Sequence, residues 1–271
     1  MLDNSLLTLN DGHVMPQLGF GTFQIPQAEA AASVRTALEV GYTLVDTAAI
    51  YRNEEGVGEA LAGREDIFLT TKVWNDDQGY EQALAAARRS LDRLGRDHVD
   101  LLLIHWPCPE KSAFLETWKA FNDLKDSGEA KSIGVSNFRV EDLQRLRDHS
   151  GTIPAVNQIE LHPGFQQREL RKLHEEMGIV TQSWSPLGQA KALDDATIRG
   201  IADELGQPAS AVVIRWHMQH GLSVIPKATG REHQQDNFAA LTFSLSEQQM
   251  ALIDALDDPD GRIGPDPATF G

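Results

Sequence analysis

The feature that most constrains the fold of this chain is a regular alternation of short apolar runs with amphipathic stretches. The apolar runs are rich in Val, Ile and Leu and have the length of buried strands. They occupy residues 44–45, 67–69, 99–104, 133–135, 155–156, 179–180 and 224–225. The stretches between them repeat apolar residues at helical spacing, for example at residues 80–94, 114–124, 140–146, 168–177 and 209–218.

With residues 19–23 added, the pattern gives about eight strand-then-helix units, which is typical of parallel strands with helices packed outside them. Such a sheet closes naturally into a barrel. The chain has 271 residues, close to the roughly 250 of a typical barrel of this kind, and no Pro/Gly-rich run divides it. We therefore predict an α/β protein in which residues 1–271 form a single (β/α)8 TIM barrel domain.

The two ends of the chain depart from this rhythm. Asp11 and Gly12 stand between short apolar segments at residues 6–9 and 14–15, which is a strong signal for a β-hairpin. We expect this hairpin to cap the bottom of the barrel. Residues 257–271 contain Pro and Gly without periodicity, so we expect them to form a loop over the surface.

Charge and cysteine content argue against several partners. The formal net charge of −16 and the pI near 4.9 repel polyphosphates, so neither nucleic acid nor an anionic membrane is expected as a partner. No apolar run approaches the roughly 20 residues of a membrane span, and Met1 to Asn4 lack signal-peptide features, so we expect a cytoplasmic protein. Cys108 is the only cysteine, which rules out an intrachain disulfide and a cysteine-based metal cluster. No metal site is expected.

Polar or aromatic side chains stand at the ends of successive predicted strands. In a barrel of parallel strands the carboxyl ends open onto one face, where barrel enzymes place their active sites, so we expect these side chains to converge. They are Asp46, Lys72, His105, Asn137, Gln158, Trp184 and Lys227. Together with the nearby Tyr51 they gather ionisable groups in one place, which is typical of a functional site.

Each of these residues taken singly has a simpler interpretation. Asp46 would be a helix N-cap, Lys72 a solvated surface lysine and His105 a satisfied core histidine. Tyr51 would be a packing residue. Trp184 would be a plug at the barrel rim.

The combination of these ionisable groups suggests a separate role for each residue in acid catalysis. The pKa of a free tyrosine, about 10, is too high for easy proton release near neutrality. A nearby lysine ammonium lowers that pKa, so Lys72 is expected to make Tyr51 a workable acid, with Asp46 keeping the lysine charged and oriented. A neutral His105 can then hydrogen-bond a substrate oxygen on which negative charge develops.

The chain resembles the aldo-keto reductase family, and the match runs nearly end to end. It is carried by G-F-G-T-F at 19–23, G-Y-T-L-V-D-T-A-A-I-Y at 41–51, T-T-K-V-W at 70–74, V-D-L-L-L-I-H-W-P at 99–107, S-I-G-V-S-N-F at 132–138, V-N-Q-I-E-L-H-P at 156–163, S-W-S-P-L-G at 183–188 and V-I-P-K at 224–227. Residues 53–58, 74–76 and 156–170 look most like bacterial 2,5-diketo-D-gluconate reductases. The resemblance implies NADPH-dependent reduction of aldehydes or ketones to alcohols, with Asp46, Tyr51, Lys72 and His105 as the catalytic tetrad and Tyr51 as general acid.

The resemblance also implies which residues hold the cofactor. Ser136, Asn137 and Gln158 would bind the nicotinamide carboxamide, and Trp184 would stack on the ring. Gly21, Thr22 and Asp46 are also expected to bind the cofactor. Ser185, Leu187 and Gly188 would lie along the pyrophosphate, and Lys227, Thr229, His233 and Asn237 around the adenosine 2′-phosphate and adenine. The family binds its dinucleotide without a Rossmann unit, in agreement with the lack of G-x-G-x-x-G here.

The phosphate end departs from the family pattern. His233 stands where the family has Arg, and Ala228 where it has Ser. An imidazole cannot form the bidentate hydrogen bonds that a guanidinium forms with a phosphate. We therefore expect NADPH to be preferred with appreciable use of NADH. Arg231 either compensates or is an exposed charge on an acidic surface.

The expected substrate is a carbonyl compound of modest size. Phe23, Trp74 and Trp106, together with His105, are expected to line its pocket, the alternative being that these aromatic residues pack the barrel rim. Two other functions stay open, NAD(P)+-dependent alcohol oxidation and a cofactor-binding regulatory role. Many relatives are monomers, and a monomer is expected here.

Overall fold

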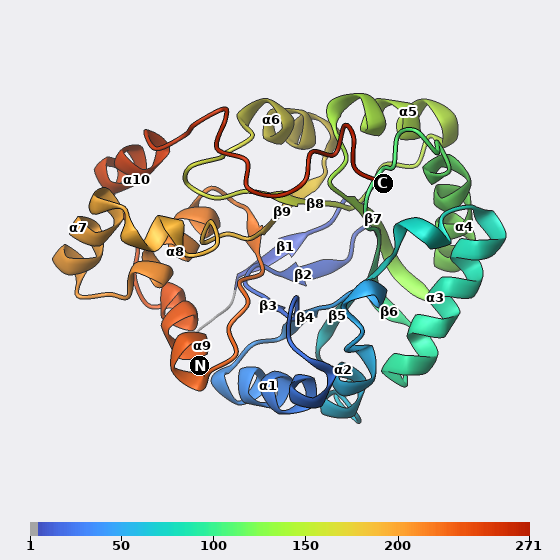
Figure 1. The fold of residues 1–271 in the computed structure, drawn as a ribbon, viewed down its shortest axis with the longest axis horizontal. Coiled ribbons are helices and arrows are strands. Elements are labelled where there is room, and N and C mark those ends of the chain that lie inside the picture. The colour runs from blue at the N-terminus through green and yellow to red at the C-terminus, as the bar shows by residue number, and fades with distance from the viewer. Residues whose placement is uncertain (1–4) are drawn as a thin grey trace.

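The protein, seen in a computed structural model that describes residues 5–271, is built on a ring of parallel strands with helices outside it (Figure 1). The strands of the ring pair in chain order. They are β3 (Phe20–Gly21), β4 (Leu44–Asp46), β5 (Phe68–Val73), β6 (Val99–Ile104), β7 (Ala130–Ser136), β8 (Val156–Glu160), β9 (Val180–Trp184) and β10 (Ser223–Val224). A parallel bridge between Leu18 and Val224 joins the first and last strands, so the sheet closes as predicted.

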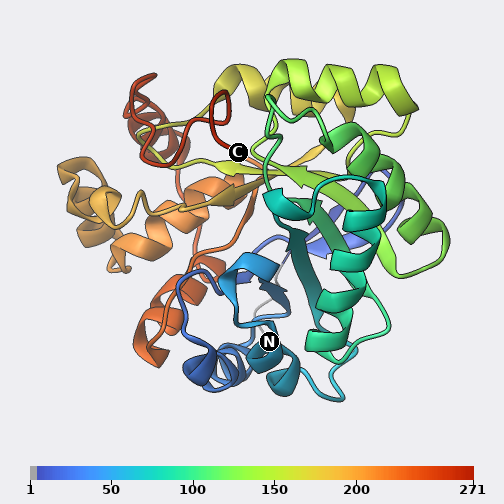
Figure 2. The same cartoon turned by 45° about the vertical axis from the view of Figure 1, so that its right-hand side comes forward.

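The helices surround this ring, and Figure 2 shows α3, α4 and α5 outside the strands of the green and teal part of the chain. The α-helices are α1 (Gln27–Val40), α2 (Glu54–Ala60), α3 (Tyr80–Leu94), α4 (Phe114–Asp126), α5 (Val140–Ser150), α6 (Arg168–Met177), α7 (Ala196–Leu205), α8 (Ala209–Gln219), α9 (Arg231–Phe238) and α10 (Glu247–Asp254). Short 3-10 turns lie at η1 (Ala49–Tyr51), η2 (Asn75–Asp77), η3 (Lys191–Asp194) and η4 (Ala239–Leu241). No helix within residues 5–271 is long and apolar enough to cross a membrane.

The alternation in the sequence arises because the strands are buried on both faces while each helix buries one side. All residues of β5 are buried, including the polar Thr70, Thr71 and Lys72. In α3 the buried positions recur at helical spacing, and the helix ends where Gly95 adopts a left-handed conformation with φ of 62°. Glycine takes that conformation at little steric cost, so the chain turns there toward β6.

The predicted N-terminal hairpin is present and covers the amino end of the barrel. β1 (Leu6–Thr8) pairs antiparallel with β2 (Val14–Pro16). Met15 is fully buried in a cluster that includes Leu44 and Phe68, the first residues of β4 and β5. Asp11 lies in the connection and forms an ion pair with Lys125 at 2.9 Å. Met1 to Asn4, used above in the argument about a signal peptide, lie outside the described residues.

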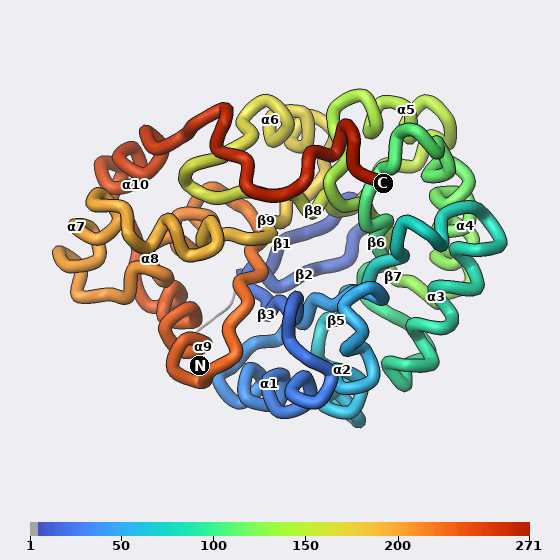
Figure 3. The backbone as a smooth tube through the Cα atoms, viewed as in Figure 1, coloured from blue at the N-terminus to red at the C-terminus, as the bar shows by residue number. Residues whose placement is uncertain are grey.

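The C-terminal segment does more than lie over the surface. Figure 3 shows it in dark red, running from α10 across the barrel to an end beside β7. Phe270 packs against Trp106, with ring centroids 4.6 Å apart, and against Trp74 at 6.3 Å. The expected surface loop therefore contributes to the carboxyl end of the barrel, because aromatic packing holds its last residues there.

Candidate active site

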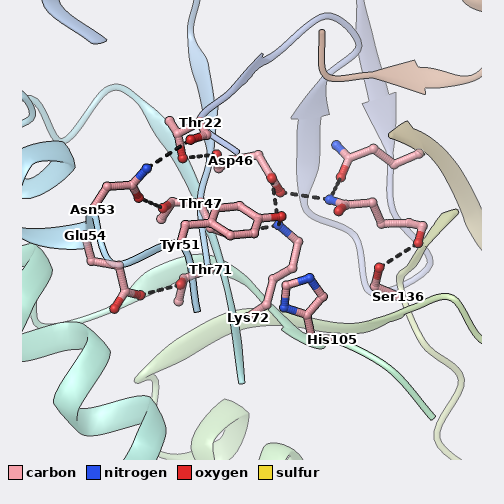
Figure 4. A network of polar contacts seen from close by, with 12 residues as sticks. Thr22, Asp46, Thr47, Tyr51, Asn53, Glu54, Thr71, Lys72, His105 and Ser136 are labelled. Atoms are coloured by element: carbon pink, nitrogen blue, oxygen red, sulfur yellow. Dashed lines mark hydrogen bonds and ion pairs between the residues drawn. The ribbon is translucent and has the colours of Figure 1, made fainter. Parts of the chain in front are cut away.

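Four of the predicted residues meet at the carboxyl ends of β4, β5 and β6 (Figure 4). Asp46 ends β4, Lys72 lies in β5, His105 follows β6, and Tyr51 ends η1. Lys72 Nζ donates hydrogen bonds to Asp46 Oδ1 at 2.6 Å and to the Thr47 carbonyl at 2.8 Å. The Tyr51 hydroxyl lies 3.5 Å from the same nitrogen. A phenol and an ammonium therefore stand side by side at the mouth of the barrel.

The Asp46–Lys72 pair is withdrawn from solvent. The Lys72 side chain is 0% exposed and that of Asp46 3% exposed. Burial raises the pKa of the Asp46 carboxyl and lowers the pKa of the Lys72 amine, and each shift is opposed by the charge of the other group. Such a pair has fixed geometry, because neither group can turn to water.

The expected lowering of the Tyr51 pKa is wrong for this state of the protein. Burial, followed by the negative charge of Asp46, raises the pKa of Tyr51 well above its ordinary value. The main physical reason is burial, because a phenolate withdrawn from water loses its hydration. The Lys72 ammonium lies 2.6 Å from Asp46 and 3.5 Å from the phenol oxygen, so the opposite charge of the carboxylate offsets its effect on the phenol. Tyr51 is therefore firmly protonated.

His105 has the neutral form that the sequence argument required. Burial, with a contribution from the charge of Lys72, lowers the pKa of His105 well below its ordinary value. Its ring packs edge-on to Tyr51, with centroids 5.7 Å apart. Nδ1 is buried and has no hydrogen-bond partner among the described residues.

A cluster of amides and hydroxyls continues the site along the ends of β7 and β8. Asn137 Nδ2 donates to the His105 carbonyl at 3.0 Å, and Ser136 Oγ donates to the Gln158 carbonyl at 2.7 Å. Gln158 Nε2 donates to Asp46 Oδ2 at 2.8 Å. Trp184, at the end of β9, donates from Nε1 to Asn137 Oδ1 at 2.8 Å. Gln158 and Asn137 therefore contact the tetrad directly, and Ser136 and Trp184 are linked to it through them.

Gly21 and Thr22 lie on the other side of Asp46. The Thr22 amide and its Oγ1 donate to the Asp46 carbonyl at 3.0 and 2.9 Å. The Gly21 amide donates to the Pro226 carbonyl at 3.1 Å, one residue before Lys227. A Cβ at Gly21 would stand 2.8 Å from the Ile225 carbonyl oxygen, so a side chain would push β3 away from the end of β10.

The remaining predicted cofactor residues lie away from the tetrad and form no hydrogen bond or ion pair with it in the described part of the chain. Ser185, Leu187 and Gly188 belong to a turn after β9, closed by a 2.9 Å hydrogen bond from the Gly188 amide to the Ser185 carbonyl. The others follow β10: Lys227, Thr229 and His233 are exposed, and Asn237 is buried in α9. Arg231, also exposed, is paired with Glu39 of α1.

The chain matches a known protein family over most of its length. The model of the Aldo/keto reductase family matches residues 17–258. The chain is 51% identical over 269 residues to an aldo-keto reductase of Mycobacterium sp. (strain KMS), covering 98% of this chain and 97% of the relative. The chain belongs to the aldo/keto reductase family. The resemblance seen in the motifs is thereby confirmed, and the protein is an oxidoreductase.

Further relatives of this reductase support the fold and point to chemistry. It is 44% identical to methylglyoxal reductase DkgA of Escherichia coli over 277 residues, with 100% of both chains covered. A crystal structure of a Gox0644 mutant in complex with NADPH has a TM-score of 0.98 and 48% identity, with 99% of each chain covered. The predicted (β/α)8 barrel is confirmed by this likeness.

Aromatic side chains of the reductase border the tetrad. The Phe23 ring is 54% exposed and lies 5.1 Å from the Tyr51 ring, and Trp74 lies 5.0 Å from the His105 ring. Trp106 is buried beneath Phe270. Phe270 was missed by the sequence argument. Its segment lacks periodicity, and no local pattern could indicate that it returns to the barrel.

The described residues of the reductase contain no group of three His, Cys, Asp or Glu side chains suited to a metal ion.

Proposed function

We propose that this reductase uses NADPH to reduce small aldehydes and ketones to alcohols, with Tyr51 as general acid. One observation carries the proposal: a protonated Tyr51 hydroxyl lies 3.5 Å from the Lys72 ammonium and beside a neutral His105 at the carboxyl end of the barrel. The family membership supports the reaction class. The NADPH complex of Gox0644 and the methylglyoxal reductase activity named for DkgA support the cofactor and the kind of substrate.

The donor set fits a nicotinamide dinucleotide. A carboxamide needs both an acceptor and donors, and Gln158 Oε1 accepts no hydrogen bond from the described residues while lying in the Ser136–Asn137 cluster. Trp184 offers a half-buried ring next to Asn137. Lys227 is exposed and forms no ion pair with any residue from 5 to 271, as suits a phosphate ligand. The predicted residues Ser136, Asn137, Gln158, Trp184 and Lys227 would thus hold the cofactor.

When bound, the reduced nicotinamide supplies a hydride to the carbonyl carbon. Tyr51 donates its proton to the carbonyl oxygen, so the carbon–oxygen double bond becomes an alcohol. The Lys72 ammonium then stabilises the phenolate left behind, and Asp46 holds the ammonium in place. Neutral His105 orients the carbonyl oxygen. Because every step can be reversed, the same site can oxidise an alcohol.

The aromatic border suggests the size of the substrate. Phe23, Trp74 and Trp106 would line its pocket, and Phe270, packed against Trp106 and Trp74, would add to its aromatic wall. Such an apolar lining with a few polar groups suits small carbonyl compounds, which it desolvates and orients against the Tyr51 hydroxyl.

Replacing Tyr51 tests the assignment. Tyr51→Phe removes the proton donor and keeps the ring, so the turnover number should fall by roughly a hundredfold or more, the usual contribution of general acid catalysis. The Kd for NADPH should stay nearly unchanged. Turnover is followed by the absorbance of reduced nicotinamide with methylglyoxal and a panel of aldehydes and ketones.

Tyr80→Phe is the matched control. It removes a hydroxyl of the same kind, one that donates to Asp123 at 2.5 Å on the surface of α3 and α4. Turnover of this variant should equal that of the parent protein. Near-normal turnover of Tyr51→Phe would contradict the proposed role of Tyr51.

A further inference from the structure

A buried carboxylate outside the tetrad ties the C-terminal segment to the barrel. Glu160 ends β8, and its side chain is 0% exposed. Its Oε1 accepts a hydrogen bond from the Ile263 amide at 2.6 Å, and its Oε2 accepts one from the Gly264 amide at 2.9 Å. His162 Nε2 lies 3.3 Å from Oε1. Hydrogen bonds to an ionised acceptor are stronger than neutral ones, so Glu160 fixes the segment at this point.

At this anchor the segment touches Trp184. A Cβ on Gly264 would stand 2.5 Å from Trp184 Cη2 and 2.7 Å from Glu160 Oε2. Only a residue without a side chain can therefore come so close to both groups. Trp184 in turn donates to Asn137, whose own amide donates to the His105 carbonyl.

Beyond the anchor the same segment reaches the aromatic rings that border the tetrad. Phe270 packs on Trp106 and Trp74, with ring centroids at 4.6 and 6.3 Å, and Trp74 packs edge-on to His105. The segment thus touches the ring that would stack on the nicotinamide and also the rings that would line the substrate pocket. Phe270 itself is half-buried and held by these ring contacts.

We infer that Glu160 is a positioning residue for carbonyl reduction. By binding the Ile263 and Gly264 amides it holds Gly264 against Trp184 and Phe270 over the substrate side, so one carboxylate sets both walls of the site. The inference rests on the proposed function for its kinetic meaning. Its structural part concerns the anchoring of residues 263–270 and stands apart from turnover.

Glu160→Gln tests the anchor. The amide offers one acceptor and places an NH2 group against a backbone N–H, so at least one charge-assisted hydrogen bond is lost. Backbone hydrogen exchange of residues 263–270 should become about tenfold faster, as expected from the loss of one bond to a charged acceptor. Asp11→Asn is the control, because it neutralises another largely buried carboxylate that accepts a backbone N–H, at the opposite end of the barrel. It should leave this exchange unchanged.

Steady-state kinetics test whether Glu160 affects catalysis through residues 263–270. In Glu160→Gln the KM for the carbonyl substrate should rise severalfold while kcat changes less, because the tetrad is untouched. Gly264→Ala keeps the carboxylate but displaces the segment, so it should reproduce both the faster exchange and the higher KM. This second variant covers the case in which Glu160→Gln folds poorly.

Phe270→Ala completes the test as a double-mutant cycle. If Glu160 acts through the segment, Phe270→Ala should raise KM in the parent and add little in Glu160→Gln. Independent effects of the two substitutions, or unchanged exchange in Glu160→Gln, would overturn the inference. If the parent protein reduces no carbonyl compound, the proposed function fails, and the exchange measurement still decides whether Glu160 anchors the segment.

Discussion

Asp46 and Lys72 bury opposite charges beside each other, and stability alone does not explain the arrangement. The cost of removing two ions from water commonly equals or exceeds their mutual attraction, so an apolar pair would serve the fold equally well. Lys72 is also bonded to the Thr47 carbonyl, and Asp46 to Gln158, which leaves one direction of the ammonium open toward Tyr51. The pair is better explained by the proton chemistry of its neighbour.

Single residues at the phosphate end govern the expected choice of cofactor. Arg231 is paired with Glu39, and His233 is exposed at the position where the family resemblance leads us to expect Arg. Glu39→Gln frees the Arg231 guanidinium, so the Kd for NADPH should fall severalfold while the Kd for NADH stays the same, because only NADPH carries the 2′-phosphate. Fluorescence titration with each cofactor measures both constants.

His233→Arg is the reference variant for this prediction, since it places a guanidinium at the position where the family resemblance leads us to expect one. It should lower the Kd for NADPH by about tenfold, which corresponds to the gain of one good charge-assisted hydrogen bond. Equal changes in both Kd values in Glu39→Gln would show that Arg231 does not reach the phosphate. In that case Arg231 is a surface charge of the acidic molecule, the second interpretation left open by its sequence.

Among the elements, the N-terminal hairpin contributes to stability and not to chemistry. Met15 is fully buried against the amino ends of the barrel strands, whereas its neighbour Val14 in β2 is 51% exposed. Met15→Ala leaves a cavity and should lower the free energy of unfolding by about 2–5 kcal/mol. The turnover number should not change, because the proposed active site lies at the other end of the strands.

Val14→Ala is the paired control from the opposite face of β2. It removes two methyl groups that already contact water, so the free energy of unfolding should change by less than about 0.5 kcal/mol. Urea denaturation of both variants gives the comparison. Equal losses of stability would mean that the hairpin does not plug the barrel.

The elements also show why some features could be predicted from the sequence and others could not. The helix expected at residues 80–94 is observed as Tyr80–Leu94, because its buried positions recur at helical spacing and Gly95 ends it. Strand ends predicted the meeting of Asp46, Lys72 and His105, since closure of a parallel barrel brings those ends together. The positions of Phe270 and Glu160 depend on contacts between distant segments, which leave no periodic signal in either segment.

The direction of the Tyr51 pKa was beyond sequence reasoning for a related cause. Residue types alone indicated that a lysine would lie near the phenol. They did not indicate how deeply the phenol would be buried, nor that the charge of Asp46 would act on the phenol as well as on the lysine. Electrostatic shifts depend on such differences of an ångström or less.

The molecule as a whole carries a net charge of −16 and yet buries histidines that must stay neutral. His174 Nε2 accepts from Asn157 Nδ2 at 2.9 Å, so its proton is on Nδ1, 2.8 Å from Thr181 Oγ1, and the ring has no acceptor site left for a second proton. His217 is fully buried with one ring nitrogen near the Pro186 carbonyl and the other without a partner. Burial lowers the pKa of each to about 3.

This burial predicts acid sensitivity of the fold. The unfolded chain binds a proton at each of these histidines below its ordinary pKa of about 6.5, and the native state does not, so stability must fall as pH falls through that value. Between pH 6.5 and pH 5 each histidine should remove about 1.5 kcal/mol from the free energy of unfolding. This loss of stability begins at a pH above the range in which ordinary carboxylates titrate. The contribution of the histidines can therefore be separated from that of the carboxylates.

Urea unfolding measured across this pH range checks the prediction, and His174→Gln isolates one histidine. Glutamine can accept from Asn157 and donate to Thr181 but does not titrate, so this variant should lose about 1.5 kcal/mol less between pH 6.5 and pH 5 than the parent does. His149→Gln, at an exposed position of α5, should follow the parent curve, because that side chain is solvated in both states. A parent protein equally stable at pH 6.5 and pH 5 would mean that the buried histidines take up protons without unfolding.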